Sequence, residues 1–245
     1  MPAPADEPSV GAMNEHDAPV AIITGASRGL GRALAEGLAD AGWRLVIDAR
    51  TPDALAEARW NLPAGTVAIA GDVTDPAHRA ELIAAAAELG RLDLLVNNAG
   101  ILGPSPQPSV AEYPLAALRD VYEVNVFAPL ALAQLALPAL LAADGCLIMV
   151  TSDAAVEPYP GWGGYGSAKA ALDQLTAVLG AEHPDLAVYA VDPGDLRTAM
   201  HQRAFPGEDI SDRPLPETAV PAFLRLLGER PPSGRYRAAD LLAAV

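Results

Sequence analysis

The sequence predicts an α/β fold of one domain, in which a doubly wound parallel β-sheet carries helices on both faces. Short apolar runs, rich in β-branched residues or leucine, alternate along the chain with longer Ala- and Leu-rich stretches. The runs show no polar alternation, which is typical of strands buried on both faces of a parallel sheet. The length of 245 residues, 51% of them hydrophobic, suits one domain with a large core. The resulting βαβαβ order favours the doubly wound arrangement.

The expected strands are the apolar runs VAIIT (20–24), WRLVID (43–48), TVAIA (66–70), LDLLV (92–96), CLIMV (146–150) and LAVYAV (186–191). Helices are expected near 30–41, 53–60, 76–89, 111–141 in two pieces, and 165–182. After Asp192 the pattern loosens into a polar loop (207–218), a short helix (219–229) and a possible last strand (234–238). Because loops on a rigid scaffold carry specificity, we expect residues 195–216 to cover a substrate.

Residues 1–18 are predicted to be a disordered acidic tail, and residues 19–245 the single catalytic domain. The tail is rich in proline, contains four acidic residues and no Lys or Arg, and lacks the basic flank and apolar stretch of a signal peptide. The whole chain has 31 acidic and 16 basic residues, a net charge of -15. Such a surface would repel nucleic acid and anionic membranes, so a cytoplasmic protein with neither partner is expected.

An uncharged stretch at 124–143 is long enough to span a bilayer. It contains Asn125, Gln134 and two prolines, and no basic cluster flanks it to set an orientation. We therefore favour a helix that is buried in the protein or at a subunit contact.

Cysteine and histidine give no sign of metal or thiol chemistry. The single cysteine, Cys146, lies in an apolar run and is expected to be buried and inert. His16, His78, His183 and His201 are scattered and are expected at the surface or in loops. Without a CxxC or HxxxH pattern, no metal site is expected.

A glycine-rich turn follows the first predicted strand. The sequence VAIITGASRGLGRALAEGLADAG places glycines at 25, 29 and 31 before an amphipathic helix. Glycine permits a tight turn and lets backbone N–H groups approach an anion at the positive end of the helix. A plain β–α connection could use the same glycines, but the position after the first strand favours a dinucleotide. No Gly-Lys-Ser/Thr follows, which excludes a Walker loop.

The spacing Gly25-x-x-x-Gly29-x-Gly31 resembles the TGxxxGxG turn of the classical short-chain dehydrogenase/reductases. The segments GDVTD (71–75), NNAG (97–100) and DPGDLRT (192–198) also resemble that family, in order and at its spacing. The resemblance implies a Rossmann-type NAD(P)-binding sheet, with Asp72 at the adenine and residues 192–198 at the nicotinamide. The cofactor-binding residues that it implies are Thr24, Gly25, Ser27, Arg28, Gly29, Leu30, Gly31, Arg50, Asp72, Val73, Asn98, Ala99, Gly100, Tyr165, Lys169, Pro193, Gly194 and Thr198.

Tyr165 and Lys169 form the candidate catalytic pair. Reduction of a carbonyl by hydride leaves an alkoxide that needs a proton, and a tyrosine with a pKa of about 10 is a poor donor unless a nearby ammonium lowers that pKa. Residues four apart share a helix face, so Lys169 can lie beside Tyr165. Ser152, 13 residues before Tyr165, can hydrogen-bond the substrate oxygen and matches the family's catalytic serine. Asn125 matches the family's asparagine, which implies a water linking Lys169 to solvent.

Each of these residues also has an ordinary structural explanation. Tyr165 could simply pack at a helix start, Ser152 could be a cap or turn residue, and Asn125 could be a buried amide satisfied by backbone. The occurrence of all four at family spacing favours catalysis.

The end of the second strand, VIDAR (46–50), bears on the choice of cofactor. An acid there binds the ribose 2′-hydroxyl of NAD, whereas arginine attracts the 2′-phosphate of NADP. By resemblance, Ala49 stands where NAD-preferring members carry the acid. Arg50 and Arg28 then point to NADP(H). If the strand ended one residue earlier, Asp48 would instead lie at the ribose, so NAD(H) remains an alternative cofactor.

The favoured function is an NADP(H)-dependent reductase or dehydrogenase of a carbonyl/alcohol pair, with Tyr165 as general acid/base. The alternative from another class is a regulatory or scaffold protein that binds a dinucleotide without turnover. An epimerase or dehydratase is disfavoured. Tyr159 and Trp162 are expected to line the substrate pocket beside Ser152 and Tyr165, which suggests an apolar portion on the substrate. A homodimer through the long helices is expected, while the unusual C-terminal sequence puts the family's tetramer contact in doubt.

Overall fold

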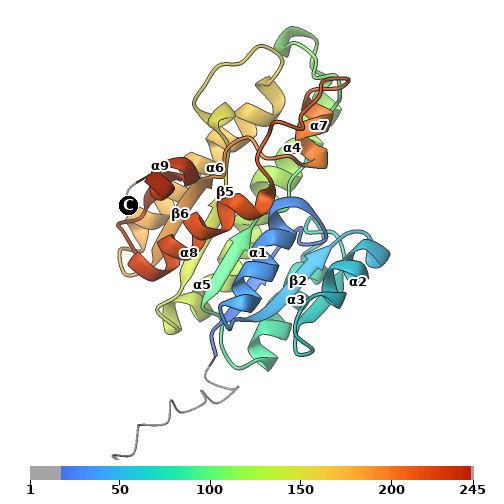
Figure 1. Cartoon of the computed structure of the whole chain (residues 1–245). Coiled ribbons are helices and arrows are strands. Elements are labelled where there is room, and N and C mark those ends of the chain that lie inside the picture. Colours follow the sequence, from blue (N-terminus) through green and yellow to red (C-terminus); the bar gives the residue numbers. More distant parts are fainter. Residues whose placement is uncertain (1–17, 244–245) are drawn as a thin grey trace, which may run out of the picture.

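The computed structural model describes residues 18–243 as a seven-stranded parallel sheet covered by helices (Figure 1). The strand order is β3-β2-β1-β4-β5-β6-β7, and each neighbouring pair is parallel. The strands are β1 (Val20–Ile23), β2 (Arg44–Ala49), β3 (Val67–Ala70), β4 (Leu94–Asn97), β5 (Cys146–Val150), β6 (Ala187–Asp192) and β7 (Gly234–Arg237). The predicted doubly wound α/β fold is confirmed.

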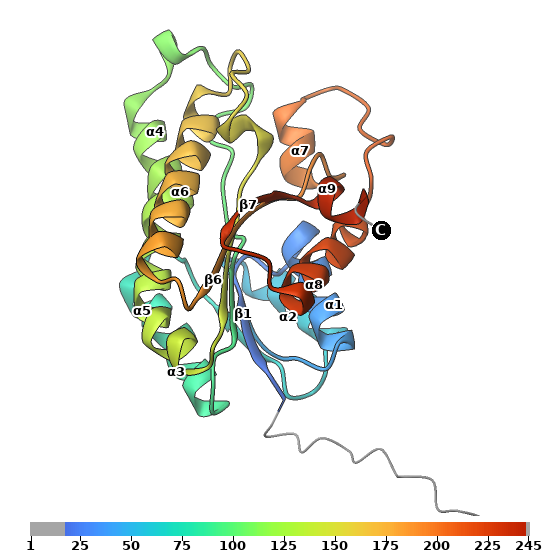
Figure 2. The ribbon, with the colours of Figure 1, turned by 90° about the vertical axis from the view of Figure 1, so that its left-hand side faces the viewer.

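The helices are α1 (Gly29–Asp40), α2 (Pro52–Trp60), α3 (Pro76–Glu88), α4 (Leu115–Tyr122), α5 (Ala128–Ala142), α6 (Gly163–Glu182), α7 (Ala199–Ala204), α8 (Val220–Glu229) and α9 (Ala238–Ala243). Figure 2 shows α1, α2 and α8 on one face of the sheet and α3 to α6 on the other.

Each face of the sheet has its own hydrophobic core. Successive side chains of a strand point to opposite faces, and β1 follows this rule: Ala21 and Ile23 pack into the core under α1 and α8, and Val20 and Ile22 into the core under α3 and α5. All four residues of β1 are buried. The unbroken apolar runs in the sequence therefore do reflect central strands.

The uncharged stretch lies within one long helical segment. A π-helical turn, Glu123–Phe127, joins α4 directly to α5, so the expected two pieces are continuous. Leu115–Ala142 is 28 residues long and contains an 18-residue window with a mean hydropathy of 1.8, enough by length and composition to cross a membrane. Its side chains Leu132, Ala136 and Leu140 are buried against the sheet, which is the contact of a core helix.

Some expectations differ from the structure. β3 lies at the sheet edge, with Ala68 and Ala70 exposed on one face and Val67 and Ile69 only partly buried on the other, so the expected burial on both faces is wrong for this strand. α7 interrupts the expected cover loop at 195–216, and α9 has no counterpart among the predicted elements. The predicted tail lies outside the described residues up to position 17, so its disorder stays a prediction.

Candidate active site

A cavity of about 830 Å³ opens at the carboxyl ends of the strands. It spans the point between β1 and β4 where the strand order reverses, the usual ligand-binding position in doubly wound sheets. Most of the predicted site residues line it, from the glycine turn through Arg50, Asp72 and Asn98 to Ser152, Tyr165 and Thr198. Thr24, Gly31, Asn125 and Tyr159 are not among its lining residues. The volume is of the size that ligand sites take, about 300–1,000 Å³.

The glycine turn is shaped by contacts with the segment that follows β4. Gly25 and Gly29 have φ values of +68° and +56°, in the left-handed region that favours glycine. The Asn98 amide donates to the Thr24 carbonyl at 2.8 Å, and the Thr24 hydroxyl accepts from the Asn98 N–H at 3.0 Å. A Cβ on Gly31 would lie 2.4 Å from Asn98 Nδ2 and 2.5 Å from the Gly25 carbonyl oxygen. Thr24 and Gly31 thus build the turn without lining the cavity.

Asp48 supports this turn from the end of β2. Its side chain is buried; Oδ1 accepts from the Gly25 N–H at 2.7 Å, and Oδ2 lies 2.9 Å from His78 Nε2. His78 is itself buried, at 5% exposure, so its expected surface position is wrong. The hydrogen bond to Asp48 raises the pKa of His78. No sequence signal linked these two residues, because they are 30 positions apart and meet only when α3 packs beside β2.

The His78–Asp48 pair predicts a pH-dependent stability. Because the folded-state pKa of His78 is raised above 6.5, its charged form stabilises the fold fully below that pH, and this contribution is lost as pH rises through the folded pKa. We expect His78→Asn to lower the free energy of unfolding by about 1.5–3 kcal/mol near pH 6, and by less at high pH. Thermal melts between about pH 5.5 and 8.5 would measure it. His183→Asn is the control, and equal pH slopes in wild type and His78→Asn would contradict the prediction.

Arg28 and Arg50 lie exposed at the mouth of the cavity. Within residues 18–243, neither guanidinium has a hydrogen bond or a carboxylate at ion-pair distance, so both are available to an anion. Both oxygens of Asp48, by contrast, are already engaged by Gly25 and His78.

Tyr165 and Lys169 lie on one face of α6, where both side chains are buried. Lys169 Nζ lies 5.6 Å from the Tyr165 ring centroid and donates to the Val150 carbonyl at 2.7 Å. Within residues 18–243 the Tyr165 hydroxyl has no hydrogen-bond partner. Its hydroxyl is therefore free for a ligand in the cavity that it lines.

The electrostatics of this pair differ from the expectation. Burial, and then the carboxylates of Asp192 and Asp153, raise the pKa of Tyr165 above its usual value, whereas the sequence argument expected Lys169 to lower it. Burial also lowers the pKa of Lys169 to about 8. Two carboxylates that the sequence analysis had not placed near the tyrosine thus oppose its ionisation.

Ser152 lies across the same cavity with a neighbour that the sequence reasoning missed. Its hydroxyl donates to Asp153 Oδ1 at 2.9 Å, and Asp153 Oδ2 accepts from the Tyr159 hydroxyl at 2.9 Å. Tyr159 is exposed and does not line the cavity, so the structure does not place it on the pocket wall as predicted. The sequence did offer a signal for this contact, because Asp153 directly follows Ser152.

Asn125 lies in the π-helical turn and is buried. Its Oδ1 accepts from the Ile101 N–H at 2.9 Å, and its Nδ2 donates to the Ile101 carbonyl at 2.8 Å. The amide side chain is therefore satisfied by backbone, as the alternative explanation held, and it ties the long helix to the segment after β4.

Comparison with known proteins decides the family. The family model described as short chain dehydrogenase matches residues 19–209. The chain belongs to the short-chain dehydrogenase family. An uncharacterized oxidoreductase of Schizosaccharomyces pombe is 32% identical over 181 residues, covering 74% of this chain and 72% of the relative. Sepiapterin reductase of Mus musculus is 34% identical over 201 residues, covering 76% and 77%. A solved short-chain dehydrogenase of Shigella flexneri, complexed with NADP, is 27% identical with a TM-score of 0.82, covering 90% of this chain and 97% of that chain.

This short-chain dehydrogenase has an aromatic wall at the far side of the cavity. The Trp162 ring lies 6.0 Å from Tyr165 and 5.9 Å from Phe205, measured between ring centroids. Leu102 and Met200 pack in the same cluster. Residues 195–201, including part of α7, line the cavity. The structure thus places Trp162 and residues 195–201 on the wall of the cavity, and their contact with a substrate stays a prediction.

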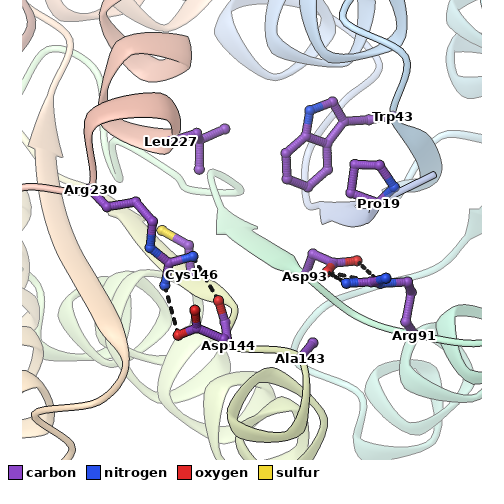
Figure 3. Close-up of a pocket in the computed structure, with 9 residues that line it drawn as sticks. All are labelled: Pro19, Trp43, Arg91, Asp93, Ala143, Asp144, Cys146, Leu227 and Arg230. Carbon is purple, nitrogen blue, oxygen red and sulfur yellow. Dashed lines mark hydrogen bonds and ion pairs between the residues drawn. The ribbon is translucent and has the colours of Figure 1, made fainter. Parts of the chain in front are cut away.

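A second cavity, of about 290 Å³, lies at the opposite ends of the strands (Figure 3). Its two arginines are engaged, Arg91 with Asp93 and Arg230 with Asp144. Cys146 is buried there, as expected, and burial raises the pKa of its thiol to about 12, which disfavours the reactive thiolate. In this short-chain dehydrogenase the chemistry-bearing groups therefore gather in the larger cavity.

Proposed function

We propose that the chain is an NADP(H)-dependent oxidoreductase that interconverts a carbonyl and an alcohol, with Tyr165 as the general acid/base. The observation that carries the proposal is the placement of Ser152, Tyr165 and Lys169 on the wall of one cavity that also contains the glycine turn. Membership of the short-chain dehydrogenase family supports an oxidoreductase of this kind.

The residues present fit a nicotinamide dinucleotide. At Gly25 and Gly31 a Cβ would collide with the backbone of Ala99 and of Gly25 respectively, so the turn is closely packed. Gly25, Ser27 and Gly29 of this turn line the cavity. α1 begins at Gly29, and its amino-terminal end favours phosphate. When bound, the nicotinamide would supply or accept the hydride. The cradle would be formed by the glycine turn, Asp72, Asn98 to Gly100, and Pro193 to Thr198.

The protein's own groups handle the proton. In the direction of reduction, the buried Tyr165 hydroxyl donates its proton to the oxygen of the former carbonyl. Its raised pKa keeps it protonated at neutral pH. Lys169, held by the Val150 carbonyl, places an ammonium beside the phenolate that results. Ser152 orients the substrate oxygen, for which its hydroxyl must turn from Asp153 toward the substrate.

The preference for NADP(H) rests on Arg28 and Arg50. Both are exposed at the cavity mouth, while Asp48 is engaged with Gly25 and His78. The Shigella flexneri relative complexed with NADP supports the same choice. NAD(H) is the competing cofactor.

Arg50→Ala tests that preference. Loss of a charge-assisted contact to the 2′-phosphate is expected to weaken NADPH binding about 10- to 100-fold, and NADH binding much less. Fluorescence titration of both nucleotides would measure the two dissociation constants. Equal losses for NADPH and NADH would remove Arg50 as the reader of the phosphate.

The function as a whole is tested by a screen of ketones, aldehydes and alcohols that follows NADPH absorbance, with NADH alongside. Compounds with a flat apolar portion come first, because Trp162 lines the pocket and its ring packs against Phe205. A protein that binds NADPH and turns over no compound would favour the alternative of a dinucleotide-binding regulatory protein.

We also propose a cytoplasmic homodimer that contacts through the outer faces of the long helices. Phe127, Leu135 and Val178 are large apolar residues exposed there, at 52%, 45% and 42%. A solution mass of a single chain at micromolar concentration would contradict the dimer.

A further inference from the structure

Arg235, on β7, contacts the segments that carry the candidate catalytic residues. β7 pairs with β6 and contacts α6, the helix that carries Tyr165 and Lys169 (Figure 2). The Arg235 guanidinium donates to Asp173 Oδ2 at 3.0 Å, to the Ser152 carbonyl at 3.0 Å and to Asp192 Oδ2 at 3.3 Å. One side chain therefore joins three segments that converge on the site.

Each of the three partners of Arg235 is close in the structure to a residue of the candidate active site. Asp173 follows Lys169 by one turn of α6, on the same face. Ser152 accepts through its backbone, so the contact fixes the peptide from which its hydroxyl projects into the cavity. Asp192 ends β6, lines the cavity, and accepts from the Gly194 N–H at 3.0 Å, which sets the turn at residues 193–194.

The charges explain why a cation is needed at this position. Asp192 is 3% exposed, and the second oxygen of Asp173 is buried without a hydrogen-bond partner in residues 18–243. Buried carboxylates are costly unless a cation compensates them. The charged and titratable groups that line this part of the cavity, or that act on Tyr165, Lys169 and Asp192, are Asp153, Asp173, Asp192, Asp195, Lys169, Arg197, Arg203, Arg235, Arg237, Tyr159 and His201. Asp192 and Asp153 already oppose ionisation of Tyr165, so removal of the cation paired with Asp192 leaves the phenolate in a still more negative setting.

We propose that Arg235 is a positioning residue of the active site, which fixes Ser152 relative to Tyr165 and neutralises the carboxylates of Asp173 and Asp192. The proposal rests on the oxidoreductase function proposed above. Arginine suits the role because its planar fork serves several acceptors at once, whereas lysine offers a single charged centre.

The test compares Arg235→Met and Arg235→Lys with the control Arg237→Met, which removes an exposed cation two residues along the same strand. Within residues 18–243 the Arg237 guanidinium makes no hydrogen bond. Arg235→Met is expected to lower kcat at least about tenfold with NADPH affinity nearly unchanged. It is also expected to move the ascending limb of the pH profile of alcohol oxidation, where Tyr165 must be ionised, to higher pH, since the phenolate is less favoured. Arg235→Lys should recover part of both effects. Arg237→Met removes a charge that lies beyond ion-pair distance of Asp192 and breaks no hydrogen bond, so it should keep the wild-type kcat and move the pH limb less than Arg235→Met does.

Two results would overturn the proposal. In the first, Arg235→Met has the same kcat and pH profile as Arg237→Met. In the second, Arg235→Met loses kcat but keeps the wild-type pH profile, which is the result expected of a merely structural role. If Arg235→Met does not fold, the double variant with Asp192→Asn, which leaves no unpaired charge at Asp192, decides the matter. Its kcat is expected to stay low because Ser152 still lacks its anchor, and a wild-type kcat would overturn the proposal. Wild-type protein without turnover would instead overturn the proposed function and this inference together.

Discussion

Tyr165→Phe is expected to lower kcat for carbonyl reduction about 10²- to 10⁴-fold, the usual contribution of a positioned general acid. The substitution keeps the ring, whose centroid lies 6.0 Å from Trp162, and removes only the hydroxyl. Because that hydroxyl has no hydrogen-bond partner within residues 18–243, stability and NADPH affinity should both be preserved. Steady-state kinetics, thermal melts and a nucleotide titration on the same preparation would separate these effects.

Tyr113→Phe provides a matched control. Tyr113 is also buried, burial raises its pKa, and its hydroxyl likewise lacks a partner in the described part of the chain, yet it does not line the large cavity. Its loss should leave kcat unchanged. Turnover of Tyr165→Phe within threefold of the Tyr113→Phe value would show that another group supplies the proton.

Gly31→Ala is expected to weaken NADPH binding about 10- to 100-fold, because overpacking typically costs about 1–3 kcal/mol. The new Cβ would lie 2.4 Å from Asn98 Nδ2 and 2.5 Å from the Gly25 carbonyl oxygen. The carbonyl belongs to the turn itself, so relief of the collision must displace the backbone that would hold the phosphates. Isothermal titration with NADPH would measure the loss.

The control for this experiment is Gly228→Ala, at a helical glycine of α8 where a Cβ would meet no atom within 4 Å. Alanine in a helix is more favourable than glycine by about 1 kcal/mol, so this variant should bind NADPH normally and melt no lower than wild type. Similar NADPH affinities for Gly31→Ala and Gly228→Ala would show that the close packing of the turn is not needed for binding.

The sequence predicted those features that depend on local pattern. β1 and β5 are short and apolar throughout, and both proved fully buried. Glycine spacing marked the turn after β1, and the four-residue spacing of Tyr165 and Lys169 placed them on one helix face. In each case the relevant neighbours are only a few residues away.

Features that depend on contacts distant in sequence were missed. The sequence around His78 has no pattern that predicts its burial. His78 lies on α3, and its partner Asp48 lies on β2. The raised pKa of Tyr165 arises first from burial and then from Asp192 and Asp153, and only the assembled sheet provides both. β3 reads as a central strand because its sequence is apolar, but an edge position is a property of the whole sheet.

The exposed arginines at the cavity mouth also affect how fast an anionic cofactor arrives. With a net charge of -15, the protein as a whole would repel NADPH, while Arg28 and Arg50, in the role proposed above, would attract it at one place. Long-range repulsion is screened at lower ionic strength than attraction at close contact. Moderate salt should therefore speed the encounter between cofactor and protein, and only stronger salt should slow its capture, so that the association rate passes through a maximum.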